Sequence, residues 1–230
     1  MKKKLLALVL AAGMVASMAA CGNTNSSGSA SAGNSKDTSA TAESTDSDLA
    51  YVKDKGTLVV GITDFEPMDY QDENGNWIGF DADLASAFAE SLGIDVEFVE
   101  IDWDNKILEL DGKTIDCVWN GMTLTDEVTS SMSCNNAQVV VVPSDVADKY
   151  QDKDSLKDLT FAVESGSAGE AQAQELGLNY TAVTAQSDAL MEVAAGTSDA
   201  TIIDSLMAAA MVGEGTGYSN LTYTIGLNDE

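Results

Sequence analysis

Alternating apolar and polar segments predict the folded part of the chain. Between residues 57 and 225, short apolar runs rich in Val, Ile and Thr are separated by segments with apolar residues at helical spacing. The runs favour buried strands and the spacing favours helices. The expected strands are 57–62, 96–101, 115–119, 138–142, 160–163, 180–183, 200–203 and 221–225, and the expected helices are 81–92, 106–110, 168–176, 187–195 and 204–212. This alternation predicts mostly parallel sheets flanked by helices, an α/β fold.

Local signals refine several of these elements. The dipeptide Asn74-Gly75 lies between two short extended segments and predicts a hairpin. Asp81 and Ser187 are expected to cap the helices that they precede, because short polar side chains accept hydrogen bonds from the first free N–H groups. The first of these helices is expected to pack through a stripe of large apolar residues, Leu84, Phe88 and Leu92.

The N-terminus has the pattern of an exported lipoprotein. Three lysines precede an apolar run that ends near residue 20, which is too short for a confident bilayer span and fits a signal peptide. The sequence MAAC at 18–21 matches the lipobox, so we expect residues 1–20 to be removed and Cys21 to carry the lipid. A plain secretory signal with an incidental cysteine is the alternative. Residues 21–49 are rich in Ser, Gly, Asn and Thr, and predict a flexible tether.

Composition narrows the function classes. The chain has 38 acidic and 11 basic residues, a formal charge of -27, and every basic residue is Lys. This charge argues against nucleic-acid binding and against electrostatic attachment to anionic lipid. It either keeps an exported protein soluble or attracts cationic ligands. The chain has no His, so the common general base and His-based zinc sites are absent, and we expect no catalytic residue, no metal and no cofactor. Cys117 and Cys134 are expected either to form a disulfide or to remain two thiols.

Five segments of the chain form a recognisable series. They read LVVG at 58–61, GFDADLA at 79–85, GMTLTDE at 121–127, VESGSAGE at 163–170 and DATIID at 199–204. Together, and in this order, they resemble the family 3 extracellular solute-binding proteins, the amino-acid receptors of ABC importers.

The resemblance implies a two-lobed periplasmic-binding-protein-like fold that closes over one small molecule. Lobe 1 would span residues 50–137 and lobe 2 residues 138–230, with the family's return to lobe 1 absent. It implies a monomer without enzymatic activity, held by its lipid to the outer face of the cytoplasmic membrane, that delivers an amino acid or related amine to an ABC permease. The alternatives are a dehydratase-like enzyme on the same fold, and a sensory or degenerate binding domain.

The resemblance also implies which residues bind the ligand. Two aromatic residues would sandwich it, a group around Thr123 and a helix opening would meet its carboxylate, and Asp204 would accept its ammonium group. The implied ligand-binding residues are Phe65, Trp103, Asn120, Gly121, Thr123, Ser165, Ser167 and Asp204. The aromatic residues could instead belong to the core, Ser167 could be a simple helix cap, and Asp204 a solvent-facing one.

One departure from the family bears on the ligand. The family's carboxylate-binding arginine would follow Glu127, where this chain has Val128, and the chain contains no Arg. Three acidic residues, Glu66, Asp69 and Glu164, are expected in segments that face the ligand. The sequence therefore predicts a ligand whose positive charge counts for more than its carboxylate: a basic amino acid, or an amine derivative whose carboxylate is masked.

Overall fold

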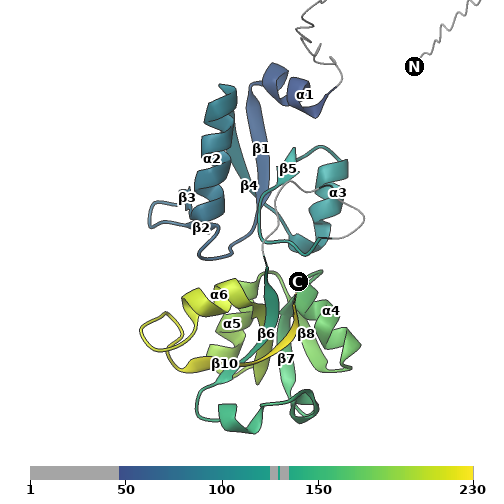
Figure 1. The fold of residues 1–230 in the computed structure, drawn as a ribbon, viewed down its shortest axis with the longest axis vertical. Coiled ribbons are helices and arrows are strands. Elements are labelled where there is room, and N and C mark those ends of the chain that lie inside the picture. Colours follow the sequence, from purple (N-terminus) through teal and green to yellow (C-terminus); the bar gives the residue numbers. More distant parts are fainter. Residues whose placement is uncertain (1–46, 125–128, 130–134, 230) are drawn as a thin grey trace, which may run out of the picture. The chain divides into compact units, whose positions relative to one another are not determined.

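The structure is a computed structural model that describes residues 47–124, 129 and 135–229 (Figure 1). The described residues do not include Cys21, Val128 and Cys134. Lipid attachment at Cys21, the role of Val128 in place of the family's arginine, and the disulfide between Cys117 and Cys134 therefore stay predictions. The described residues belong to one compact unit with two larger sheets and one two-stranded hairpin. Within the described ranges, no helix combines the length and apolar character needed to cross a bilayer.

The first sheet is three-stranded and entirely parallel. Across the sheet its strands are β4 (Asp95–Glu100), β1 (Thr57–Ile62) and β5 (Cys117–Val118). The helical elements around it are α1 (Asp48–Lys55), α2 (Phe80–Leu92), η1 (Trp103–Asn105) and α3 (Lys106–Asp111). The sequence pattern predicted each of them except α1 and η1. Helix α1 is joined to the sheet by an ion pair between Lys55 and Asp116, 2.5 Å apart.

Alternate residues of β1 face the two sides of this sheet, as the two-residue period of a strand requires. Val60 and Ile62 pack with Ala85 and Ala89 of α2, whereas Val59 packs with a second cluster. That second cluster consists of Ile101, Trp103 and Ile115 with partly buried neighbours. Trp103 is therefore placed at the end of the sheet by core packing.

The predicted hairpin is confirmed. Strands β2 (Tyr70–Gln71) and β3 (Trp77–Ile78) are antiparallel and are joined by the loop that contains Asn74. The Asp72 carboxylate accepts hydrogen bonds from the backbone N–H groups of Asn74 and Asn76, at 2.8 and 2.9 Å. The Asn76 side-chain amide also donates to this carboxylate at 3.0 Å, and this bond, followed by the backbone bonds, lowers the pKa of Asp72 to about 2.

The second sheet has five strands and is mixed. In order across the sheet, its strands are β10 (Leu221–Asp229), β6 (Ala137–Pro143), β9 (Ala200–Asp204), β7 (Thr160–Glu164) and β8 (Asn179–Val183). Strands β9, β7 and β8 are parallel, whereas β6 is antiparallel to both of its neighbours. The pairing of β6 with β10 brings Ala137 opposite Asp229.

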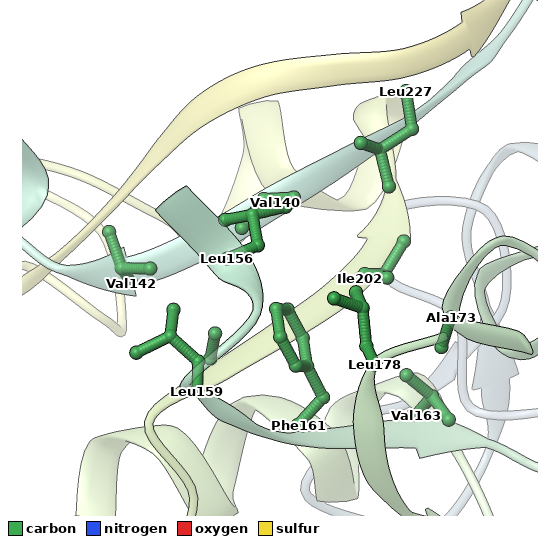
Figure 2. Close-up of a cluster of buried hydrophobic side chains, with 11 residues drawn as sticks. Val140, Val142, Leu156, Leu159, Phe161, Val163, Ala173, Leu178, Ile202 and Leu227 are labelled. Atoms are coloured by element: carbon green, nitrogen blue, oxygen red, sulfur yellow. The ribbon is translucent and has the colours of Figure 1, made fainter. Parts of the chain in front are cut away.

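Helices cover both faces of the second sheet. The longer helices are α4 (Ala168–Glu175), α5 (Gln186–Ala195) and α6 (Ser205–Met211), and two short turns are η2 (Ala147–Lys149) and η3 (Lys153–Leu156). Val140 and Val142 of β6 belong to the cluster on one face, which Figure 2 shows together with Phe161 and Ile202. Val139 and Val141 belong to the cluster that contains residues of α5 and α6. This burial on both faces explains why β6 is apolar throughout.

Two expected caps and one expected helix face are wrong. Helix α2 begins at Phe80 because the chain turns at Gly79, whose φ is 120°, so Asp81 lies inside the helix. Likewise, Ala185 occupies the capping position of α5, and Ser187 lies inside this helix. The buried residues of α2 are Ala82, Ala85 and Ala89, whereas Phe88 is 42% exposed and lies against the ring of Trp119.

Candidate functional site

A cavity of about 440 Å³ lies where several strands end. Its size falls within the range of small-molecule sites. The residues that line it are Trp103, Lys106, Ile107, Gly121, Met122, Thr123, Gly166, Ser167, Ala168, Ala171, Gln172, Gln186, Asp204 and Asn228. Most of them belong to segments that follow the carboxyl ends of β4, β5, β7, β8 and β9. Ligand sites of α/β sheets lie at this edge.

Five of the eight residues expected to bind the ligand line this cavity. They are Trp103, Gly121, Thr123, Ser167 and Asp204. The other three, Phe65, Asn120 and Ser165, do not line it. The structure therefore brings Gly121, Thr123, Ser167 and Asp204 to the cavity, but only one of the two aromatic residues.

Phe65 lies in a hydrophobic cluster instead of on the cavity wall. It is 3% exposed and packs with residues such as Val139 and Met207. A Cβ added to Gly121 would lie 2.7 Å from the Phe65 ring. Phe65 thus packs behind Gly121 and supports the cavity wall. From the sequence alone, an aromatic residue in this role cannot be distinguished from one that stacks on a ligand.

Asn120 and Ser165 serve local structure. The Asn120 side chain donates a hydrogen bond to the Thr63 hydroxyl at 2.7 Å, which joins the segments that follow β5 and β1. The Ser165 N–H donates to the Val183 carbonyl at 2.9 Å and extends the pairing of β7 with β8. These contacts hold the loops that carry the cavity residues.

Asp204 is a buried carboxylate at the end of β9, 8% exposed. It accepts hydrogen bonds from three side-chain amides, those of Asn136, Gln138 and Gln186, with the Gln138 bond measuring 3.0 Å. The Gln186 side chain also accepts a bond from the Asp204 N–H at 2.9 Å. A buried carboxylate is stable only when such donors compensate for the lost water. Asp204 makes no side-chain cap bond to α6, so the alternative of a solvent-facing cap does not describe it.

A second buried carboxylate lies near Asp204. Glu164 ends β7 and is 3% exposed, and burial together with the charge of Asp204 raises its pKa to about 8. A hydrogen bond from Gln186 and the charge of Lys106 partly offset this rise. The two carboxylates are thus close enough that the charge of Asp204 opposes ionisation of Glu164.

The loop between β7 and α4 forms another wall. The Ser167 hydroxyl accepts a hydrogen bond from the Glu170 N–H at 3.1 Å, so Ser167 caps α4 as well as lining the cavity. The Glu170 carboxylate accepts a bond from the Gly166 N–H at 2.8 Å. Gly166 has a φ of 70°, and a Cβ there would lie 2.7 Å from a carboxylate oxygen of Asp104. Only glycine fits both this backbone conformation and this close approach.

Trp103 and Lys106 also line the cavity, next to the loop that carries Gly166. Trp103 is 6% exposed, so it is both a core residue and a cavity residue. The Lys106 ammonium lies 4.7 Å from the centre of the Trp103 ring. It donates hydrogen bonds to the carbonyl oxygens of Trp103 at 3.1 Å and Gly166 at 3.0 Å.

Sequence reasoning missed six polar residues of this site. They are Lys106, Gln172, Gln186 and Asn228, which line the cavity, and Asn136 and Gln138, which hold Asp204. The position of Lys106 one turn after Trp103 was a usable signal, because side chains three residues apart lie on one helical face. Of the three acidic residues expected to face the ligand, none lines the cavity, and Asp69 is completely buried elsewhere.

The arrangement is suited to binding a charged small molecule. It offers a fixed carboxylate, an ammonium group, a hydroxyl from Thr123 and an aromatic face. Within the described part of the chain, no group of His, Cys, Asp and Glu is arranged to hold a metal ion.

Known proteins resemble this chain in sequence. Residues 58–168 match the family model of bacterial extracellular solute-binding proteins, family 3. The arginine-binding extracellular protein ArtP of Bacillus subtilis is 31% identical over 214 residues, which cover 90% of this chain and 74% of that protein. The L-cystine-binding protein TcyA of the same organism is 32% identical over 206 residues, covering 87% of this chain and 68% of that protein.

A solved structure shares the fold. Holo ArgBP from T. maritima superposes with a TM-score of 0.72 at 31% identity, over 79% of this chain and 82% of that chain. With this fold and the matches over most of its length, the chain belongs to the bacterial extracellular solute-binding proteins, family 3.

Proposed function

We propose that this protein binds an amino acid in the cavity and delivers it to an ABC permease. The observation that carries the proposal is Asp204, a buried carboxylate on the cavity wall that three amides hold in place. An ammonium group is the natural partner of such a carboxylate, because a charge-assisted bond in a site shielded from water is strong. In this proposal the protein closes around the ligand and neither forms nor breaks a covalent bond.

The proposed ligand carries an additional positive charge, as a basic amino acid does. The net charge of -27 favours the approach of cations. Among the relatives named above, ArtP and ArgBP carry names that refer to arginine binding, which agrees with this choice.

The proposal includes the place where the protein works. A signal peptide followed by Cys21 would attach the mature chain by its lipid to the outer face of the membrane. Residues 22–48, which contain no large apolar residue, would then give the binding domain reach toward a permease.

Thermal unfolding of the purified protein with a panel of amino acids tests the binding proposal. A ligand at roughly a hundredfold excess over its Kd should add about 2.7 kcal/mol to the stability and raise Tm by several degrees. Asp204→Asn keeps the shape but removes the charge, and should abolish most of that rise. Asp145→Asn at an exposed position is the matched control and should leave the rise unchanged. The absence of a Tm rise with every amino acid in the wild type would refute the proposal.

A further inference from the structure

The cavity has two opposite charges on its wall. Of the described residues that line it, Lys106 and Asp204 are the two that carry a formal charge. Lys106 belongs to α3, beside the first sheet, and Asp204 to the end of β9 in the second sheet. An α-amino acid also carries one positive and one negative group, so the cavity and a zwitterion are complementary in charge.

The Lys106 ammonium is held at a defined place. Carbonyl oxygens of Trp103 and Gly166 accept hydrogen bonds from it at 3.1 and 3.0 Å, and it lies over the Trp103 ring. These contacts restrict a side chain that is flexible in solution. The Lys106 side chain therefore loses little further conformational entropy when a ligand binds.

On the basis of the proposed function, we propose that Lys106 binds the carboxylate of the ligand. The ligand then lies with its ammonium group toward Asp204 and its carboxylate toward Lys106. The chain has no Arg that could take this role, and all 11 of its basic residues are Lys. A lysine is a point charge without the forked geometry of a guanidinium. The Thr123 hydroxyl on the same cavity supplies a further donor to the carboxylate.

A pair of ligands that differ only in the carboxylate tests this assignment. Agmatine is arginine without its carboxylate, and titration calorimetry with L-arginine and agmatine compares the two. The wild type should bind L-arginine much more tightly. Lys106→Met should weaken L-arginine binding roughly 10- to 100-fold, the range for one charged hydrogen bond. It should leave agmatine binding within about threefold of the wild type or make it tighter, because only a positive charge is lost.

Two further variants separate this role from a purely structural one. Lys106→Arg retains a cation and should keep most of the preference for L-arginine. Lys157→Met removes a lysine whose side chain is 64% exposed and should change neither affinity. Equal weakening of both ligands by Lys106→Met would overturn the assignment and indicate that Lys106 only joins the cavity walls. An unchanged L-arginine affinity would overturn it as well.

The failure of this inference is distinct from failure of the proposed function. If the wild type binds another amino acid instead of arginine, the test pair is that amino acid and its decarboxylated amine. If the wild type binds no amino acid, the proposed function fails and this assignment fails with it. If it binds one and Lys106→Met does not change the preference for the carboxylate, only the assignment fails.

Discussion

At the scale of single residues, the candidate site depends on amides that orient a carboxylate. Asp204 was predicted from the sequence because it ends a strand in a segment that resembles the family. Its three amide partners come from Asn136, Gln138 and Gln186, which lie 68, 66 and 18 residues away in the chain. Isolated amides carry no sequence signal of this role. Only the pairing of β6 with β9 brings the first two to Asp204.

Asp69 is expected to make the protein less stable as pH rises. It is completely buried, and burial with a smaller contribution from Asp81 raises its pKa from 3.8 to about 8, partly offset by the Ala82 N–H. Between about pH 4 and pH 8 the folded chain keeps a proton that the unfolded chain has lost, so stability falls as pH rises through this window. Asp69→Asn removes this effect. Denaturant unfolding at pH 5, 6.5 and 8 should show a smaller loss of unfolding free energy in the variant.

Two comparisons check this prediction. Asp95→Asn changes an exposed carboxylate and should keep the pH dependence of the wild type. Glu164→Gln should flatten the dependence as Asp69→Asn does, because the pKa of Glu164 is also raised to about 8, chiefly by burial. An Asp69→Asn profile that runs parallel to the wild type would show that Asp69 is ionised in the folded protein.

At the scale of helices and strands, the apolar pattern predicted strands better than helix faces. Strand β6 was predicted because an uninterrupted run of valines has few alternatives to burial on both faces. The predicted face of α2 was wrong because the size of its residues suggested the stripe of Phe88, whereas the alanines at 85 and 89 are the residues that pack with the sheet. Which face of a helix meets the sheet depends on the partner residues of the sheet, and the helix sequence alone does not contain this information.

The close approach of α4 to β9 should be sensitive to one methyl group. A Cβ added to Gly169 would lie 2.5 Å from the backbone carbonyl oxygen of Ile202, which cannot move without disturbing the sheet. Gly169→Ala should therefore destabilise the protein by about 1–3 kcal/mol, the usual cost of overpacking. It should also weaken ligand binding, because α4 carries Ser167 at the cavity.

Thermal unfolding and calorimetry of this variant provide the measurement. Gly217→Ala is the matched control, since a Cβ there meets nothing within 4 Å, and it should have little effect on either quantity. A Gly169→Ala protein as stable as the wild type would mean that α4 can shift away from β9 at no cost.

At the scale of the whole molecule, attachment to the membrane is a separate property from ligand binding. If Cys21 carries the lipid, Cys21→Ser should move the protein from the membrane fraction to the medium while its affinity for the ligand stays the same. Cys117→Ser is the control and should remain in the membrane fraction. A wild-type protein that is already soluble, with no lipid mass on its N-terminal peptide, would contradict the lipoprotein prediction.

The pairing of Ala137 with Asp229 has a consequence for the modularity of the protein. Ala137 lies at the start of β6 and Asp229 at the end of β10. These two residues lie close together in space, because paired antiparallel residues are about 5 Å apart. Residues 137–229 thus form a segment whose two ends lie side by side. A segment with neighbouring ends can be inserted into a surface loop of another protein without separating the two ends of that loop. Phe65 and Met68 pack against its core from outside the range, so a new host would have to replace these contacts.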